Sequence, residues 1–192
     1  MGMEIEVKFA VADPEALRRR LAAAGFHEQT ARTFEHNILY DTPDRRLRAE
    51  TAILRVRKYG DRWVVTHKCL PPHHDPGARH KHRQETESQV EDGEALGRIF
   101  TQLGYQPVFT YEKWRTEYAD ASGHCFLDET PIGVYAELEG PPDWIDATGR
   151  VLGVGPGEFI TLSYGRLFEQ WREQTGRSAE NLTFAEIPAA NR

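Results

Sequence analysis

Cysteine is scarce in this sequence of 192 residues: the chain has two, Cys69 and Cys125, and they lie far apart. Two widely separated cysteines provide neither a disulfide framework nor the close-spaced thiol pairs of a zinc knuckle. We therefore expect both to be unreactive packing residues.

Long apolar runs are also missing. No segment approaches the roughly 20 consecutive apolar residues of a membrane-spanning helix, and the N-terminus lacks the basic-then-apolar order of a secretion signal. These absences predict a cytoplasmic protein that makes no membrane contact.

The chain has no excess of positive charge, because 24 Lys and Arg face 30 Asp and Glu, a net charge of −6. General nucleic-acid binders usually carry a basic excess, so we expect no nucleic-acid partner. The composition is 39% hydrophobic, which is sufficient for a sizeable core. No repeat or low-complexity linker divides the sequence, which predicts one domain over residues 1–192. The oligomeric state is open between a monomer and a homodimer.

Most of the regular patterns in the sequence are those of β-strands. Alternating apolar and polar residues between turn signals predict strands at 3–11, 34–47 (running into a Pro-Asp turn), 51–59, 62–69, 83–90, 108–120, 124–130 and 134–140. Helical spacing occurs at 12–25, 91–105, 143–153 and 160–176. Neighbouring strands joined by short turns favour an antiparallel α+β fold with a closed or nearly closed sheet. We expect the core at about 3–175 and a weakly patterned tail at 176–192.

The polar faces of these strands carry like charges at successive positions. In MEIEVKFAV, Glu4, Glu6 and Lys8 share one face, and apolar residues occupy the other. Later strands repeat this arrangement with the pairs Arg55 and Arg57, Glu85 and Glu87, Lys113 and Arg115, and Glu137 and Glu139. Lys68 shares its face with Val64 and Thr66.

A solvated sheet face is the simplest explanation for any one of these strands. Like charges at successive positions repel each other unless a counter-ion is present, so their recurrence favours a shared charged lumen. Carboxylates bind Mg²⁺ or Mn²⁺, and Arg and Lys bind phosphate oxygens. A polyphosphate bridged by metal ions needs both sets together.

The ordered motifs resemble the CYTH superfamily, the triphosphate tunnel metalloenzymes. EIEVK is similar to the Glu-x-Glu-x-Lys signature of that family. Further similarities follow in family order as far as about residue 168: YDTPDRRL, ILRVR, the Lys68 strand, RQETE, KWR, LDETPIGVYAELE and LSYGRLF. This ordered set is far more specific than the pentapeptide alone.

The resemblance implies an eight-stranded antiparallel closed β-barrel, or tunnel, with flanking helices, which binds a triphosphate group with Mg²⁺ or Mn²⁺. The implied metal ligands are Glu4, Glu6, Asp128, Glu137 and Glu139. Glu85 and Glu87 would be metal ligands or water-orienting acids. The implied triphosphate-binding residues are Lys8, Arg55, Arg57, Lys68, Lys113 and Arg115. The interval from Asp128 to Glu137 is slightly shorter than in the family pattern. Glu129, a second acid, lies beside Asp128, so Asp128 is the least firmly assigned of these ligands.

Members of this family include inorganic triphosphatases, thiamine triphosphatases, class IV adenylate cyclases and RNA triphosphatases. We expect an enzyme that hydrolyses inorganic triphosphate or a small organic triphosphate. The alternatives are a class IV adenylate cyclase, which converts ATP to cyclic AMP and pyrophosphate, and a non-catalytic polyphosphate- or nucleotide-binding module. The general base is open between Glu85 and a lysine of lowered pKa, Lys8 or Lys68.

The segment LPPHHDPGARHKH, residues 70–82, has no apolar period and is broken by Pro and Gly. Its four histidines, which lack a fixed metal-ligand spacing, are His73, His74, His80 and His82. A mobile lid over one tunnel mouth is therefore favoured over a transition-metal site.

Overall fold

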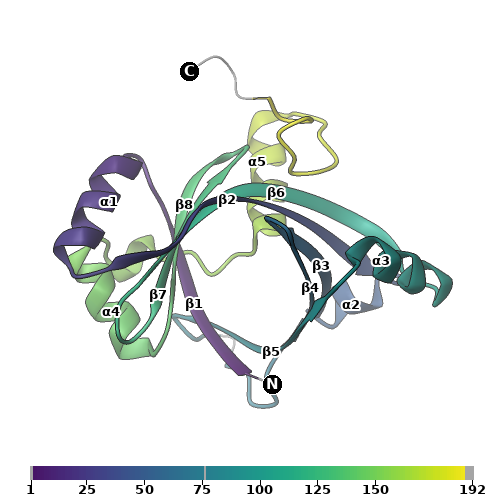
Figure 1. Cartoon of the computed structure of the whole chain (residues 1–192), viewed down its shortest axis with the longest axis horizontal. Helices are drawn as coiled ribbons and strands as arrows, with labels where there is room; N and C mark the ends of the chain where they lie inside the picture. The colour runs from purple at the N-terminus through teal and green to yellow at the C-terminus, as the bar shows by residue number, and fades with distance from the viewer. Residues whose placement is uncertain (1, 76, 189–192) are drawn as a thin grey trace.

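The computed structural model describes residues 2–75 and 77–188, within which the chain forms eight strands (Figure 1). The strands are β1 (Gly2–Ala10), β2 (His27–Asp41), β3 (Ile53–Tyr59), β4 (Arg62–Cys69), β5 (Lys81–Val90), β6 (Gln106–Ala119), β7 (His124–Thr130) and β8 (Gly133–Glu139). The α-helices are α1 (Pro14–Ala23), α2 (Arg46–Ala49), α3 (Gly93–Gln102), α4 (Pro142–Val151) and α5 (Tyr164–Thr175), and a 3-10 turn, η1, spans Pro156–Glu158. The predicted α+β class is confirmed.

The strands form a closed antiparallel barrel in the order β1–β5–β4–β3–β2–β6–β7–β8, which the pairing of β8 with β1 completes. Each of the eight described strands therefore has a neighbouring strand on both sides, and none of them is an edge strand. The register places Glu6 of β1 opposite both Lys81 of β5 and Glu139 of β8. Because directly paired residues point to the same side of a sheet, these three side chains project from the same face.

Short-range signals act where the sequence predicts them. The side chain of Asp13 caps α1 by accepting a hydrogen bond from the backbone N–H of Ala16 (2.9 Å), and Pro14 is the first helical residue. Gly60, with φ +57°, turns the chain from β3 into β4. A left-handed φ favours glycine there because glycine has no Cβ.

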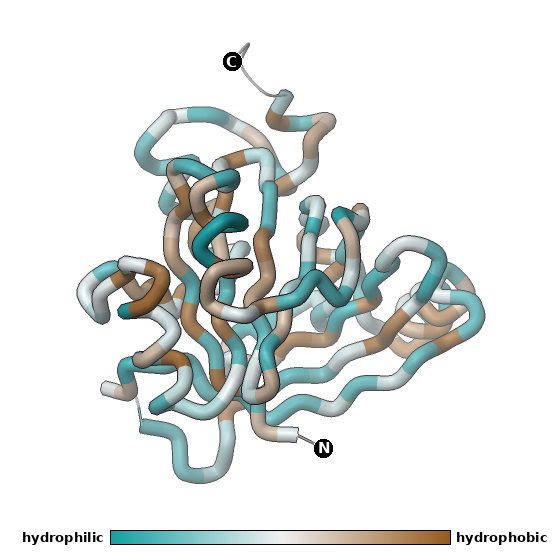
Figure 2. The backbone as a smooth tube through the Cα atoms, turned by 60° about the vertical axis from the view of Figure 1, so that its left-hand side comes forward, coloured by the Kyte–Doolittle hydropathy of each residue, from teal (hydrophilic) through white to brown (hydrophobic). Residues whose placement is uncertain are grey.

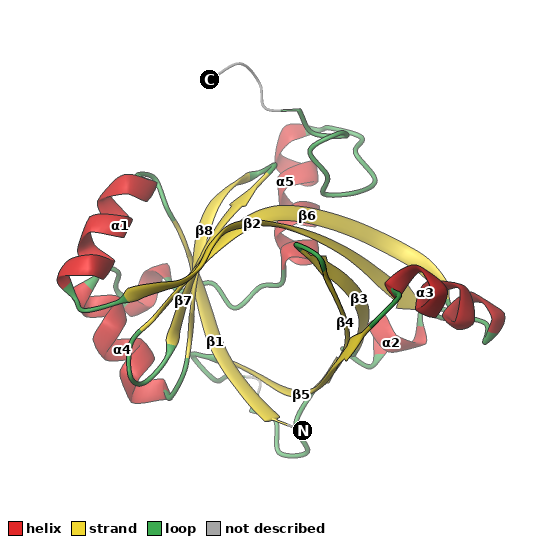
Figure 3. Cartoon of the chain, in the orientation of Figure 1, coloured by secondary structure: helices red, strands yellow, loops and turns green. Residues whose placement is uncertain are grey.

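The apolar side of the strands faces outward, toward the helices, and the polar side faces the lumen. Figure 3 shows α1, α3 and α4 outside the ring of strands and α5 partly behind it, and Figure 2 shows polar and apolar residues alternating along the chain. The buried residues that join α1 and α4 to the outside of the barrel include Val7, Phe9, Leu17, Leu21, Leu127, Leu138, Ile145 and Leu152. Each fully buried aliphatic side chain contributes roughly 1.5–3 kcal/mol, so this outer layer stabilises the barrel and leaves the lumen free for charge.

A second apolar cluster lies between α5, β6 and the segment after α5. Phe168 of α5, Leu182 and Ile187 are all nearly inaccessible to solvent. The backbone N–H of Leu182 donates to the carbonyl oxygen of Thr110 (3.0 Å), which ties this segment to β6. The packed structure therefore continues beyond the expected boundary at 175, because two apolar side chains anchor a segment whose pattern is weak. Residues 189–192 of the predicted tail lie outside the described residues.

Other boundaries also differ from the expectation. β2 starts at His27, well before residue 34, and β5 starts at Lys81 instead of residue 83, while the short helix α2 was not predicted. Residues 27–33 are mostly polar, and their pairing with β6 makes them a strand. None of the described helices has the length and apolar character needed to cross a membrane.

Candidate active site

The barrel encloses a cavity of about 750 Å³, here called the bore. Its lining includes all but one of the predicted site residues: Glu4, Glu6, Lys8, Arg55, Arg57, Lys68, Glu85, Glu87, Lys113, Arg115, Glu137 and Glu139. Ser163, Tyr164 and Gly165, at the start of α5, line it as well. Four of the five lysines in the chain line this cavity, although the net charge of the chain is negative.

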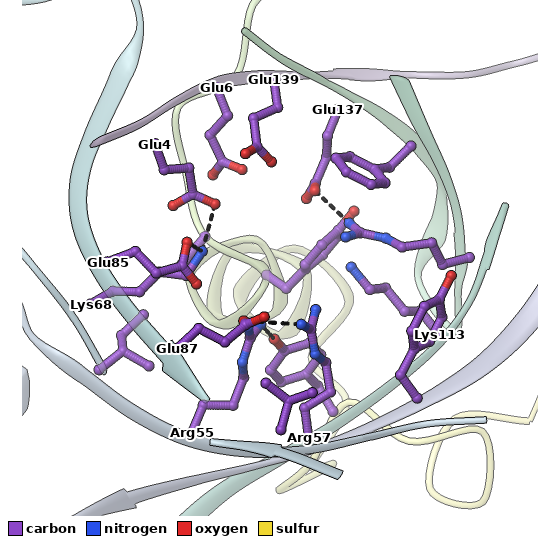
Figure 4. Close-up of a pocket in the computed structure, with 18 of the residues that line it drawn as sticks. Glu4, Glu6, Arg55, Arg57, Lys68, Glu85, Glu87, Lys113, Glu137 and Glu139 are labelled. Atoms are coloured by element: carbon purple, nitrogen blue, oxygen red, sulfur yellow. Dashed lines mark hydrogen bonds and ion pairs between the residues drawn. The ribbon is translucent and has the colours of Figure 1, made fainter. Parts of the chain in front are cut away.

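Acids occupy one wall of the bore, where Figure 4 shows Glu4, Glu6, Glu139 and Glu137 side by side. Lys68 Nζ lies 2.5 Å from Glu4 Oε1, and Lys8 Nζ lies 2.9 Å from Glu6 Oε1. Burial alone would raise the pKa of Glu6, but the ammonium groups nearby hold it well below its usual range. Glu6 is therefore a carboxylate at any pH at which the protein works.

Glu139 differs from its neighbours on this wall because its side chain makes no hydrogen bond or ion pair within the described part of the chain. Burial, together with the like charges of Glu4 and Glu6, raises the pKa of Glu139 to about 7. Glu4 contributes a further uncompensated oxygen, since its Oε2 atom is buried without a hydrogen-bond partner among the described residues. This wall therefore carries negative charge that the protein does not fully neutralise.

Replacing Glu139 by glutamine should stabilise the metal-free protein at alkaline pH. The pKa of Glu139 is about 4.5 in the unfolded chain and about 7 in the folded chain. At a pH between these two values, Glu139 holds a proton in the folded chain that it has lost in the unfolded chain. Stability therefore falls as the pH rises through this window. Glu139→Gln removes the charge, so we expect a free energy of unfolding about 1–2 kcal/mol above that of the wild type at pH 8, and little gain at pH 5.

Urea unfolding in the presence of a chelator, at pH 5 and pH 8, measures this difference. Glu91→Gln is the control, because the Glu91 side chain is exposed and outside the bore. Equal stability of wild type and Glu139→Gln at pH 8 would show that repulsion from Glu4 and Glu6 does not destabilise the ionised form of Glu139.

Bases occupy the opposite wall, where Arg55 and Arg57 lie beside Glu87 (Figure 4). Arg57 Nη2 donates to Glu87 Oε2 (3.1 Å), and Arg57 Nη1 lies 3.9 Å from Glu35 Oε2. Arg55 donates to the hydroxyl of Tyr111 (3.1 Å). These guanidinium groups are ordered by neutral and acidic partners, which orients their donors toward the lumen before any anion arrives.

Asp128 is the predicted metal ligand that does not line the bore. It is fully buried on the lumen face of β7, behind the side chains that line the bore, where it accepts hydrogen bonds from Lys113 Nζ (2.8 Å), Arg115 Nε (2.7 Å) and the Tyr164 hydroxyl (2.6 Å). Both carboxylate oxygens are thus used to hold two bases and the first residue of α5. The geometry makes Asp128 a positioning residue, and its role as a metal ligand stays a prediction.

The two lysines considered as general bases do not have lowered pKa values. Burial would lower the pKa of Lys8, but Glu137 (3.0 Å) and Glu6 raise it above its ordinary value. For Lys68, burial and Arg55 are outweighed by Glu4, Glu6 and Glu85, and its pKa is also raised. Both ammonium groups therefore hold their protons. The expectation of a lowered lysine pKa at these two positions is wrong, because each lysine has two carboxylate partners.

Glu85 remains the better of the predicted bases. Its side chain lines the bore 3.2 Å from Lys68 Nζ, and burial raises its pKa despite the opposing effect of that lysine. A carboxylate with a raised pKa accepts a proton more readily than an ordinary one.

The sequence reasoning missed Glu35, which lies behind the lining of the bore, and Lys81, which is part of that lining. Glu35 of β2 is fully buried within 4.0 Å of Lys113, Arg115 and Arg57, and its pKa is lowered to about 2 by these bases although burial opposes the shift. The period-two pattern of FEHNIL would have placed it on the lumen face. Lys81 was assigned to a loop, and its burial together with the neighbouring Lys8 lowers its pKa.

The C-terminal end of the histidine-rich loop is held against α4 by side-chain contacts. His80 is buried, and its Nε2 atom lies 2.9 Å from Asp146 Oδ1 of α4. Arg79 Nη2 lies 2.7 Å from the other oxygen of the same carboxylate. The lid prediction for the rest of this loop stays a prediction.

The donor set fits a hard divalent cation, because Mg²⁺ and Mn²⁺ prefer carboxylate oxygens as ligands. Glu4 and Glu139 provide carboxylate oxygens whose charge no protein group fully compensates. No three His, Cys, Asp or Glu side chains already converge as a metal cage within residues 2–75 and 77–188. Lysine ammonium groups lie between the acids instead. A cation that took Glu6 Oε1 as a ligand would displace the ammonium groups of Lys8 and Lys81 from that oxygen.

Comparison with known proteins agrees with this geometry. A family model described as the CYTH domain matches residues 2–140, which run from β1 to just past β8. The Methanocaldococcus jannaschii protein named "Putative adenylate cyclase MJ0240" is 28% identical over 151 residues, which are 78% of this chain and 83% of that protein.

Two solved structures share the fold. The structure of a Vibrio parahaemolyticus protein, also described as a "putative adenylate cyclase", has a TM-score of 0.75 to this chain and is 16% identical to it. The match covers 87% of this chain and 98% of the Vibrio chain. Hippeastrum HpAC1, assigned to the adenylyl cyclases but with a dominant triphosphatase activity, has a TM-score of 0.62 and 17% identity, covering 88% of this chain and 96% of its own. With most of its length matched by the family model, this chain belongs to the CYTH domain family.

Proposed function

We propose that this protein is a divalent-metal-dependent triphosphatase that hydrolyses inorganic triphosphate or a small organic triphosphate. The observation that carries the proposal is the bore itself, in which an incompletely neutralised acidic wall faces a wall of arginines and lysines. A triphosphate with its metal ions needs both surfaces at once.

Glu4, Glu6, Glu137 and Glu139 would hold the Mg²⁺ or Mn²⁺ ions, with Glu85 and Glu87 as further candidates. Bound metal would supply charge neutralisation on the phosphate oxygens. Arg55, Arg57, Lys113 and Arg115 bind the remaining oxygens and hold the chain of phosphorus atoms in line for attack.

In the hydrolytic step, a water molecule attacks the terminal phosphorus and the bridging P–O bond breaks, giving orthophosphate and pyrophosphate or the corresponding diphosphate. Glu85 orients the water and accepts its proton. The start of α5, with Tyr164 held by Asp128, limits the entry of bulk water on its side of the bore.

An adenylate cyclase is the second candidate, favoured by the name of the Methanocaldococcus relative. The volume of the bore, about 750 Å³, also lies in the range of pockets that enclose drug-sized ligands, and it exceeds what inorganic triphosphate alone would fill. A non-catalytic anion-binding module is less favoured, because anion binding needs the bases but not the uncompensated acids.

Incubation with triphosphate, ATP and thiamine triphosphate, each with Mg²⁺ or Mn²⁺, separates these functions. Release of orthophosphate supports the triphosphatase, formation of cyclic AMP supports the cyclase, and tight binding without turnover supports the module.

Replacing Arg57 by alanine should weaken triphosphate binding by roughly tenfold or more, because one fork of paired donors is lost from the basic wall. Titration calorimetry with a non-hydrolysable imido analogue of triphosphate measures the change. Arg48→Ala is the matched control, since Arg48 pairs with Glu169 on the exterior. Unchanged affinity of Arg57→Ala would place Arg57 outside the binding surface.

A further inference from the structure

Lys81 is a lysine of the bore that none of the family motifs includes. It is the first residue of β5 and lies directly opposite Glu6 in the β1–β5 pairing. Its Nζ atom is 2.5 Å from Glu6 Oε1, and only 12% of its side chain is exposed. The same oxygen accepts Lys8 Nζ at 2.9 Å, so one carboxylate oxygen serves two ammonium groups.

The two ammonium groups on Glu6 differ in their other partners. Lys8 has a second carboxylate, Glu137, at 3.0 Å. Lys68 and Lys113, the remaining lysines of the bore, also contact two carboxylates each. Within the described residues, Glu6 is the single carboxylate that is ion-paired with Lys81. A cation that takes over Glu6 would therefore leave Lys8 paired and Lys81 unpaired.

The backbone that carries Lys81 is anchored from the outside of the barrel. The two preceding residues, Arg79 and His80, both contact the carboxylate of Asp146, at 2.7 and 2.9 Å. The Lys81 side chain points inward while its neighbour His80 packs outward, as expected for alternation along a strand. With the backbone held in this way, the long lysine side chain is free to change its partner while its attachment point stays at the rim of the bore.

An ammonium group buried without a partner is unstable, so Lys81 released from Glu6 must find another anion in the bore. We propose that Lys81 is a further triphosphate-binding residue, which pairs with Glu6 until a divalent cation takes that carboxylate and then donates to a phosphate oxygen. This inference rests on the proposed function and extends it. The divalent cation and Lys81 compete for the Glu6 carboxylate, whereas the cation and the triphosphate bind in the bore together.

Lys81→Met tests this competition, because it should change two affinities in opposite directions. Without triphosphate, Mn²⁺ should bind more tightly than to the wild type, by on the order of tenfold, since a competing charge has been removed from Glu6. With saturating Mg²⁺, the imido analogue of triphosphate should bind about tenfold more weakly, since one donor is lost. Both are measured by titration calorimetry. A merely structural role would weaken both.

Two variants control the experiment. Lys81→Arg keeps the competing charge and should bind Mn²⁺ as the wild type does. Lys58→Met removes the one lysine outside the bore, whose side chain is exposed, and should change neither affinity. Unchanged or weaker Mn²⁺ binding by Lys81→Met, or unchanged binding of the analogue, would overturn the assignment of Lys81.

The failure of this inference is distinguishable from the failure of the proposed function. If the wild type binds both Mn²⁺ and the analogue and Lys81→Met matches it, only the role of Lys81 is wrong. If the wild type binds neither, the triphosphatase proposal is wrong and the role of Lys81 falls with it.

Discussion

Replacing Glu6 by glutamine is expected to lower triphosphate hydrolysis by about a hundredfold or more while the barrel stays folded. Glu6 is buried at the centre of the acidic wall, and its pKa is held well below the usual range by Lys8 and Lys81. Glutamine keeps the shape of the side chain but cannot supply the negative charge that a divalent cation requires.

The fold should survive this substitution because Glu6 points into the lumen, whereas the stabilising apolar contacts lie on the outer face of β1. Lys8 also keeps Glu137 as a partner, and the amide oxygen of glutamine remains an acceptor for Lys81. Orthophosphate release with Mg²⁺ measures the rate, and circular dichroism with thermal unfolding checks the fold. Glu91→Gln should retain full activity. A rate near that of the wild type in Glu6→Gln would count against a metal role for β1.

Much of the fold and of the bore could be predicted from the sequence because period-two alternation is a strong local signal. Once the strands are known to close, a face with charges at Glu4, Glu6 and Lys8 must turn inward if its apolar partner faces the helices. The sheet order and the register are long-range properties, however. The opposition of Glu6 to Lys81 across β1 and β5 could not be obtained from either segment alone.

The remaining misses have similar physical reasons. Lys81 follows a segment rich in Pro, Gly and His, so its strand character depends on pairing with β1 and not on local pattern. The lowered pKa expected for Lys8 and Lys68 is wrong because each lysine has a carboxylate partner from another strand, Glu137 for Lys8 and Glu4 for Lys68, in addition to a second carboxylate. The packing of Leu182 against β6 depends likewise on a tertiary contact.

Replacing Asp128 by asparagine should lower the free energy of unfolding by about 3 kcal/mol, the cost of breaking a fully buried ion-pair network. Asp128 is completely inaccessible to solvent, and its two oxygens accept hydrogen bonds from Lys113, Arg115 and Tyr164. Asparagine removes the negative charge that these two bases share and replaces one acceptor oxygen with a donor. Urea unfolding in the presence of a chelator measures the loss without any contribution from bound metal.

The neighbouring acid provides a matched control. Glu129 points out of the barrel, where it pairs with Arg32 at 2.8 Å in a partly exposed ion pair. Surface pairs of this kind contribute about 0–1 kcal/mol, so Glu129→Gln should unfold almost as the wild type does. The losses of stability at the adjacent residues Asp128 and Glu129 would then differ several-fold. Strand alternation directs the Asp128 side chain toward the lumen and the Glu129 side chain toward solvent. Similar losses for both variants would mean that Asp128 does not hold the basic wall and α5 together, and a ligand role would become its better explanation.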